Sequence, residues 1–227
     1  MHTPRAITID GPAGSGKSTL GASLARALGF VYFDTGVMYR ALTLAVLEAG
    51  IDPSDGSAVT ACAERIVIGV EPPTVTDGRQ YTITIDGRDV TWDIRDQRVE
   101  RAVSTAAGHP AVRVILRAQQ RAIGMRGAVV MVGRDIGSIV LPEAPLKIFL
   151  DVSIAERTRR RSAELNSRGD AVDHAALYDS IATRDARDAH VMQPAPDAVH
   201  INGDTQSPAD TLSYVLSLVP LGMRPHA

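Results

Sequence analysis

Near its N-terminus the chain carries a glycine-rich loop that only a few folds can accommodate. Residues 11–18 read Gly11-Pro12-Ala13-Gly14-Ser15-Gly16-Lys17-Ser18, which is the phosphate-binding pattern G-x-x-x-x-G-K-[ST]. A β-rich run at 6–9 precedes the loop, and leucines at four-residue intervals after it indicate a helix. In that arrangement the loop N–H groups surround a polyphosphate, the lysine reaches its β and γ groups, and the hydroxyl binds Mg²⁺. The chain is therefore predicted to bind a nucleoside triphosphate.

The use of lysine supports this interpretation. Of the 24 basic residues only two, Lys17 and Lys147, are lysines, so the chain strongly prefers arginine elsewhere. A lysine kept inside the loop indicates a position that needs a compact ammonium group and not a planar guanidinium.

Size and composition exclude several classes of protein. A chain of 227 residues fits one α/β domain with an insertion. The net charge of −2 and the pI near 6.3 offer no basic field for nucleic acid, which we do not expect as a partner. Cys62, the only cysteine, lies in an apolar helical stretch and is expected to pack in the interior. With no signal-peptide pattern or membrane-length apolar run, we expect a cytoplasmic monomer that does not associate with membranes.

Strand and helix signals alternate at both ends of the chain. Apolar runs at 6–9, 30–33, 128–132, 146–150 and 198–201 predict five strands of a parallel sheet, and we expect helices on both faces. The middle differs, with β-type segments at 66–70, 81–85 and 88–91. Asp86-Gly87 predicts a tight hairpin between the last two. Helices are expected at about 96–107 and 110–125. We therefore predict a three-layer αβα core with a small β-rich insertion at residues 62–108.

Three clusters are candidates for a second ligand site, because a phosphate-binding loop identifies the donor but not the acceptor. The first cluster, residues 34–40, follows the second predicted strand. Ligands of open α/β sheets bind beyond the carboxyl ends of strands, which places Thr35 and Arg40 near an acceptor. The alternative is that Asp34 and Thr35 cap a helix and Arg40 is a solvated helix residue.

The second cluster, residues 133–137, follows the apolar run that ends at Val132. Here Arg134 can present a bidentate fork to a phosphate beside Asp135, a carboxylate able to contact a base. The alternative is a structural salt bridge within a turn.

The third cluster is rich in arginine, with Arg157, Arg159, Arg160 and Arg161 followed by Arg168, Arg184 and Arg187. Several arginines near a polyphosphate would neutralise the charge on a transferring phosphoryl group. The alternative is a solvated helix face, but the phosphate-binding loop favours the functional interpretation.

No hydrolytic triad or paired metal-binding histidines are evident. A phosphate acceptor needs no strong general base, because its oxygen is already an anionic nucleophile at neutral pH. The lack of an obvious base is therefore consistent with a phosphate as acceptor.

Taken together, the clusters resemble the bacterial cytidylate kinases of the nucleoside monophosphate kinase superfamily. The resemblance extends over nearly the whole chain and includes segments 7–12, 34–40, 89–95, 110–113, 133–137 and 184–188. It implies transfer of the γ-phosphoryl group of ATP to CMP and dCMP with Mg²⁺. It also implies that the β-rich insertion binds the nucleoside monophosphate and that residues 154–190 form a helical lid over ATP, within one P-loop kinase domain.

The resemblance assigns roles to individual residues. Thr35, Arg113 and Asp135 match positions that recognise cytosine, while Ser104, Arg184 and Asp188 match contacts to the sugar. Arg40 and Arg134 match residues that bind the acceptor phosphate, and Ser18 matches the metal ligand. The expected catalytic residues are Lys17, Arg134, Arg157 and Arg184. The expected ATP-binding residues are Gly11, Pro12, Ala13, Gly14, Ser15, Gly16, Lys17, Ser18 and Thr19. A carboxylate paired with an arginine suits cytosine, because uracil would offer the carboxylate no amino donor.

One segment departs from the family pattern. The family usually carries a further acceptor-site arginine shortly after the Arg-Asp-x-x-Asp segment, whereas residues 189–196 contain none. The hypothesis that follows is that Arg187 or His190 substitutes for it. Two other functions remain open: a P-loop kinase for a different small acceptor, such as another nucleotide or a polyol, and a nucleotide-dependent switch without turnover.

Overall fold

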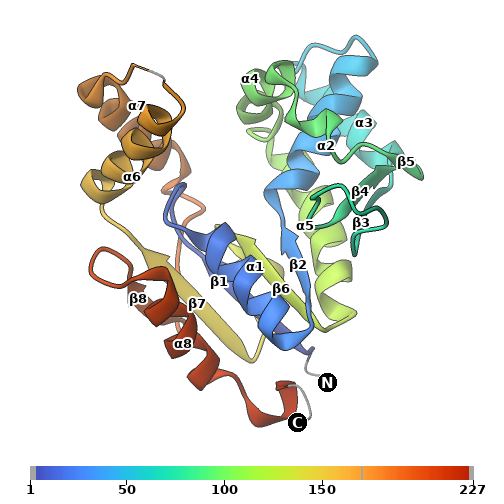
Figure 1. Ribbon diagram of the computed structural model, residues 1–227. Coiled ribbons are helices and arrows are strands. Elements are labelled where there is room, and N and C mark those ends of the chain that lie inside the picture. Colours follow the sequence, from blue (N-terminus) through green and yellow to red (C-terminus); the bar gives the residue numbers. More distant parts are fainter. Residues whose placement is uncertain (1–3, 170, 225–227) are drawn as a thin grey trace.

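The computed structural model describes residues 4–169 and 171–224 and contains a five-stranded parallel sheet (Figure 1). The strand order is β2-β6-β1-β7-β8, and every neighbouring pair is parallel. The strands are β1 (Ala6–Asp10), β2 (Val31–Asp34), β6 (Val129–Gly133), β7 (Leu146–Asp151) and β8 (Val199–Asn202). Their registers place the carboxyl ends of β1, β2 and β6 together, which gives the sheet one functional edge.

The helices cover both faces of this sheet, as the apolar strands predict. The structure has α1 (Lys17–Leu28), α2 (Gly36–Glu48), α3 (Gly56–Arg65), α4 (Gln97–Ala106), α5 (Pro110–Met125), α6 (Ile154–Ser167), α7 (His174–Asp188) and α8 (Pro208–Leu218). A Cβ on Gly21 of α1 would lie 2.6 Å from Val132, and a Cβ on Gly124 of α5 would lie 2.7 Å from Met131. Because consecutive strand residues point to opposite faces, α1 and α5 pack on opposite sides of β6. The predicted three-layer core is confirmed.

A small antiparallel sheet interrupts the core between α3 and α4. It consists of β3 (Ile68–Glu71), β4 (Thr82–Ile85) and β5 (Arg88–Asp89). Asp86 and Gly87 have φ of 50° and 83°, the two positive values that a tight I′ hairpin requires. The third strand is shorter than the predicted 88–91, since the Asp89 carboxylate accepts from the N–H and hydroxyl of Thr91 and turns the chain. A short 3₁₀ helix (Asp93–Arg95) then leads toward α4.

Two groups of elements stand above the functional edge of the sheet. In Figure 1, α6 and α7 form one group and α2, α4 and the small sheet form another, with the core below them.

A π-helical turn (Ile136–Val140) follows β6, and a 3₁₀ turn (Leu221–Met223) follows α8. Cys62 is buried, as expected. Within the described ranges, no helix has the length and apolar content needed to cross a membrane.

Candidate active site

The phosphate-binding loop joins β1 to α1 in the geometry that the sequence predicts. Gly14 and Gly16 have φ of 76° and 95°, values that a side chain would disfavour. A Cβ at Gly11 would lie 2.3 Å from the Leu150 carbonyl oxygen, so the backbone passes too close to β7 for any other residue. In the described chain no side chain caps the start of α1, and its first turn has no acidic residue. The N-terminal N–H groups and positive dipole end of α1 are thus available to an anion.

Lys17 is held inside this loop. Its Nζ donates to the Pro12 carbonyl at 2.5 Å and lies 3.5 Å from Ser15 Oγ. The pKa of Lys17 is lowered to about 8, chiefly by burial; repulsion by Arg134 and Arg157 contributes to the lowering, and the nearby carboxylates Asp34 and Asp10 oppose it. When the protein itself stabilises the charged form of an ammonium group poorly, a bound polyphosphate stabilises that form strongly.

Ser18 lies beside a carboxylate that sequence reasoning did not assign. Its Oγ donates to Asp34 Oδ2 at 3.4 Å, and the other Asp34 oxygen accepts from the Gly36 N–H at 3.0 Å. The capping alternative is therefore correct only in part: Asp34 accepts from the first N–H of α2, whereas Thr35, the N-cap residue, makes no side-chain capping bond in the described chain. Mg²⁺ prefers oxygen ligands and is usually held by one or two carboxylates or hydroxyls, water and substrate phosphates. Ser18 and Asp34 fit this donor set.

A second unassigned carboxylate, Asp10, ends β1. It is 4% exposed and accepts from the N–H groups of Ile136 and Gly137 at 2.8 and 2.7 Å. Burial raises the pKa of Asp10 to about 6, although the two N–H bonds lower it. Asp10 thereby fixes the turn after β6 against the phosphate-binding loop. The sequence signal that could have identified Asp10 is its position at the end of an apolar strand.

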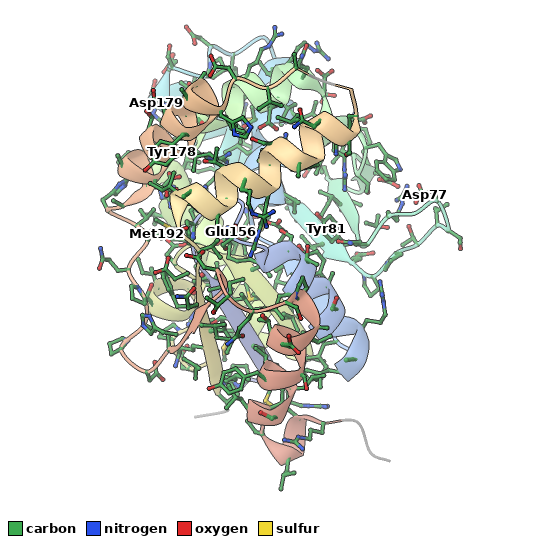
Figure 2. The ribbon with its side chains drawn as sticks, turned by 60° about the vertical axis from the view of Figure 1, so that its left-hand side comes forward. Asp77, Tyr81, Glu156, Tyr178, Asp179 and Met192 are labelled. Atoms are coloured by element: carbon green, nitrogen blue, oxygen red, sulfur yellow. The ribbon has the colours of Figure 1, made fainter. Side chains whose placement is uncertain are left out.

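A cavity of about 520 Å³ opens beside the phosphate-binding loop. The loop, α6 and the segment after β8 form its walls; the lining residues include Gly14, Ser15, Gly16, Thr19, Glu156, Arg159, Arg160 and residues 203–207. Arg160 donates to Glu156 and to the Gly203 carbonyl at 2.7 and 2.6 Å, which ties α6 to the segment after β8. In Figure 2, Glu156 lies at the end of α6 nearest the core. Sequence reasoning missed the segment at 203–207, whose residues carry no motif.

The arginine-rich cluster divides into buried and solvated members. Arg157 is 4% exposed and donates to the Val152 and Ala13 carbonyls at 2.9 and 3.0 Å and to Asp185 of α7. It therefore connects the phosphate-binding loop to both helices α6 and α7. Arg159 and Arg161 are exposed and pair with Glu156 and Glu164, as the solvated-face alternative predicts for them.

Arg134 points from the end of β6 toward α7. It forms an ion pair with Asp188, and burial, followed by the repulsion of Arg184, lowers the pKa of its guanidinium. The ion pair joins different elements and not two residues of one turn, which contradicts the local salt-bridge alternative. Arg184 is exposed on α7 near Arg134.

Asp135 is the centre of the predicted base site. Arg117 of α5 donates to its Oδ2 through Nε at 3.0 Å and Nη2 at 2.5 Å, and Arg113 lies 3.7 Å from the same oxygen. Arg113 also stacks over Tyr39 at 5.6 Å. Among the described residues no donor is recorded for Asp135 Oδ1. Sequence reasoning identified Arg113 but missed Arg117, although both lie one turn apart on the helix predicted at 110–125.

Thr35 lies at the end of β2 in the same region. Its hydroxyl donates to the Val132 carbonyl at 3.0 Å and is buried. Because that hydrogen is used, the Thr35 oxygen can only accept from a ligand. A Cβ on Gly133 would approach this oxygen to 2.7 Å, so glycine leaves room beside it.

Two predicted acceptor residues face a second cavity, of about 400 Å³, between α4 and α7. Ser104 of α4 and Arg184 of α7 line it from opposite sides. Arg40 of α2 is partly solvated and pairs with Glu100 of α4. In residues 189–196, the segment that differs from the family pattern, Val191 is buried and His190 lies in the turn after α7. The side chain of Arg187, just before this segment, lies outside the described part of the chain.

These features define a class of protein before any comparison is made. A parallel sheet, a lysine-bearing phosphate-binding loop and a second arginine-rich site at the same edge together form a P-loop phosphotransferase. Shikimate kinase from Bacteroides thetaiotaomicron has this fold, with a TM-score of 0.50 at 14% identity over 94% of this chain and 97% of that one.

Sequence comparison then identifies the family. The cytidylate kinase family model matches residues 7–220, and the chain belongs to this family. Cytidylate kinase of Chloroflexus aggregans is 56% identical over 96% of this chain and 94% of its own. The Roseiflexus castenholzii protein of the same name is 56% identical over 96% and 95%. The resemblance inferred from the sequence is confirmed.

Proposed function

We propose that this protein transfers the γ-phosphoryl group of Mg·ATP to CMP and dCMP, giving ADP and the corresponding diphosphate. The observation that carries the proposal is Asp135, a buried carboxylate with one oxygen bound by Arg117 and the other without a donor among the residues that the structure describes. The free oxygen suits the 4-amino group of cytosine, and the nearby Arg113 suits its ring acceptors. The Thr35 hydroxyl oxygen, which can only accept a hydrogen bond, would be a second acceptor for the amino group of cytosine.

The residues that bind ATP, the phosphoryl donor, would act mainly by neutralising the negative charge of its phosphates. Loop N–H groups and Lys17 bind the ATP phosphates, while Arg157 and Arg160 approach from α6. Ser18 and Asp34 would hold Mg²⁺, which supplies charge neutralisation on the phosphates when bound. Arg134, at the end of β6, is placed between the loop and α7, where it can stabilise charge on the transferring group.

The acceptor phosphate would be bound by Arg40 and Arg134, and the sugar by Ser104, Arg184 and Asp188. Its oxygen attacks the γ-phosphorus in line, the bond to the ADP oxygen breaks, and no proton needs to be removed at neutral pH. We assign acceptor binding to residues 62–108 and a closing lid to residues 154–190, within a monomer. Closure of the lid would exclude water and limit ATP hydrolysis.

The experiment is ADP release from Mg·ATP with CMP, dCMP, UMP, AMP or GMP offered separately, with ATP alone as the control for hydrolysis. Fastest turnover with CMP or dCMP supports the proposal. Fastest turnover with UMP or AMP contradicts the assignment of Asp135. Turnover with none of them would favour the alternative of a nucleotide-dependent switch.

A further inference from the structure

Arg40, proposed to bind the acceptor phosphate, already holds a carboxylate in the absence of ligand. Its Nη2 pairs with Glu100 Oε2, which lies in the first turn of α4. The side chains are 28% and 55% exposed, so a ligand can reach both. The pair joins α2, which follows a core strand, to α4, which belongs to the insertion.

Glu100 also lines the cavity between α4 and α7, together with Ser104 and Arg184. A carboxylate in this position meets the same ligand that Ser104 and Arg184 are proposed to bind. Helix α4 packs against α2, although of its ten residues only Val99 and Ala106 are fully buried. The ion pair is therefore one of the contacts that fix α4 relative to α2.

We propose that Glu100 is a positioning residue that occupies Arg40 until the acceptor phosphate displaces it. The inference rests on the proposed function, in which Arg40 binds the phosphate of CMP. Two anions then compete for one guanidinium. A phosphate dianion with three acceptor oxygens outcompetes a solvated carboxylate. When the product leaves, Glu100 takes Arg40 back, so the ion pair weakens acceptor and product binding alike.

The expected effect follows from the exposure of the pair. Exposed ion pairs change an equilibrium by about 1.5- to 5-fold. Glu100→Gln keeps the shape of the side chain but removes the competing charge. CMP should therefore bind this variant about 1.5- to 5-fold more tightly, and the KM for CMP should fall while the KM for ATP is unchanged. The gain should shrink at about 0.5 M salt, because the exposed pair is screened there.

The test is calorimetric titration of the full-length protein with CMP, using wild type, Glu100→Gln, Arg40→Gln and the double variant. Glu48→Gln is the matched control, because Glu48 lies on α2 and forms an exposed pair with Arg88 at 2.5 Å outside this cavity. Titration with cytidine, which lacks the phosphate, is the control on the ligand side. Thermal unfolding of each variant verifies that it is folded.

The inference predicts tighter CMP binding in Glu100→Gln, no such gain in Glu48→Gln or with cytidine, and no gain when Arg40→Gln is already present. Unchanged or weaker CMP binding in Glu100→Gln overturns it, as does an equal gain in the Arg40→Gln background. Failure of the proposed function is a separate result. It would appear as wild-type protein that binds CMP but does not phosphorylate it.

Discussion

Replacing Lys17 with methionine should strongly reduce activity and make the protein more stable at pH 7. The pKa of Lys17 is lowered from 10.5 to about 8, chiefly by burial, so the folded state disfavours the charged form. Full conversion of that shift gives about 3 kcal/mol. Because the side chain is partly exposed, we expect about 1–2 kcal/mol of stabilisation. This corresponds to an increase in Tm of about 2–8 °C for a chain of this size.

The sign of the pH dependence provides a sharper test of the same variant. Below pH 8 Lys17 is charged in both states, so the destabilisation is fully present. Between about pH 8 and 10.5 the folded protein has released this proton while the unfolded chain still holds it, so wild-type stability rises with pH. The Tm difference between Lys17→Met and wild type should therefore narrow from pH 7 to pH 9.5.

Thermal unfolding at the two pH values, combined with turnover of CMP, measures both effects. Lys147→Met is the matched control, because the other lysine forms an ion pair with Asp197 at 2.6 Å and its loss should lower Tm. A Lys17→Met variant that is less stable than wild type at pH 7, or a Tm difference that widens toward pH 9.5, would contradict a destabilising buried charge at Lys17. Activity should fall by at least about 10²–10³-fold, the effect of removing one donor to a developing charge.

Three further predictions concern the proposed lid, the proposed base site and the metal. Asp185→Ala removes the carboxylate partner of the buried Arg157, so the free energy of unfolding should fall by about 1.5–3 kcal/mol. Mg·ATP should raise the Tm of this variant by more than it raises the Tm of wild type. The control Glu164→Ala, at an exposed ion pair, should change stability by less than about 0.5 kcal/mol. Arg117→Leu removes two donors from the base-site carboxylate, so the KM for CMP should rise about 5- to 100-fold with a smaller change in kcat; an unchanged KM would contradict the role of this arginine. Removing Mg²⁺ with EDTA should stop turnover reversibly, and Asp34→Asn should raise the Mg²⁺ concentration for half-maximal rate; an unaltered requirement would exclude Asp34 as a ligand.

The sequence predicted those parts of the fold that depend on local pattern. The phosphate-binding loop, the five apolar strands and the hairpin at Asp86-Gly87 each carry a signal within a few residues, and each is present in the structure. The helix at 110–125 was predicted with its bounds, because Pro110 is favoured at the first position of a helix. Strand ends were less accurate, since side-chain hydrogen bonds such as those of Asp89 end β5 early.

The site was predicted less completely, because its geometry depends on partners distant in the sequence. Asp135 and Arg134 could be selected from their position after a predicted strand, and Arg157 as a member of the arginine-rich cluster. Their partners could not, since Arg117 is 18 residues from Asp135, and Asp185 is 28 residues from Arg157. No periodicity connects residues at these separations, and only the packing of α5 and α7 against the sheet edge brings them together.

Base selection by Asp135 is tested by the ratio of kcat/KM for CMP to that for UMP, measured with saturating Mg·ATP in wild type and in Asp135→Asn. We expect a large preference for CMP in wild type. In Asp135→Asn the ratio should fall at least about tenfold, because an amide can donate to the uracil oxygen while a carboxylate can only accept. A wild-type enzyme without preference for CMP, or a ratio that Asp135→Asn leaves unchanged, would contradict the claim that this carboxylate selects the base.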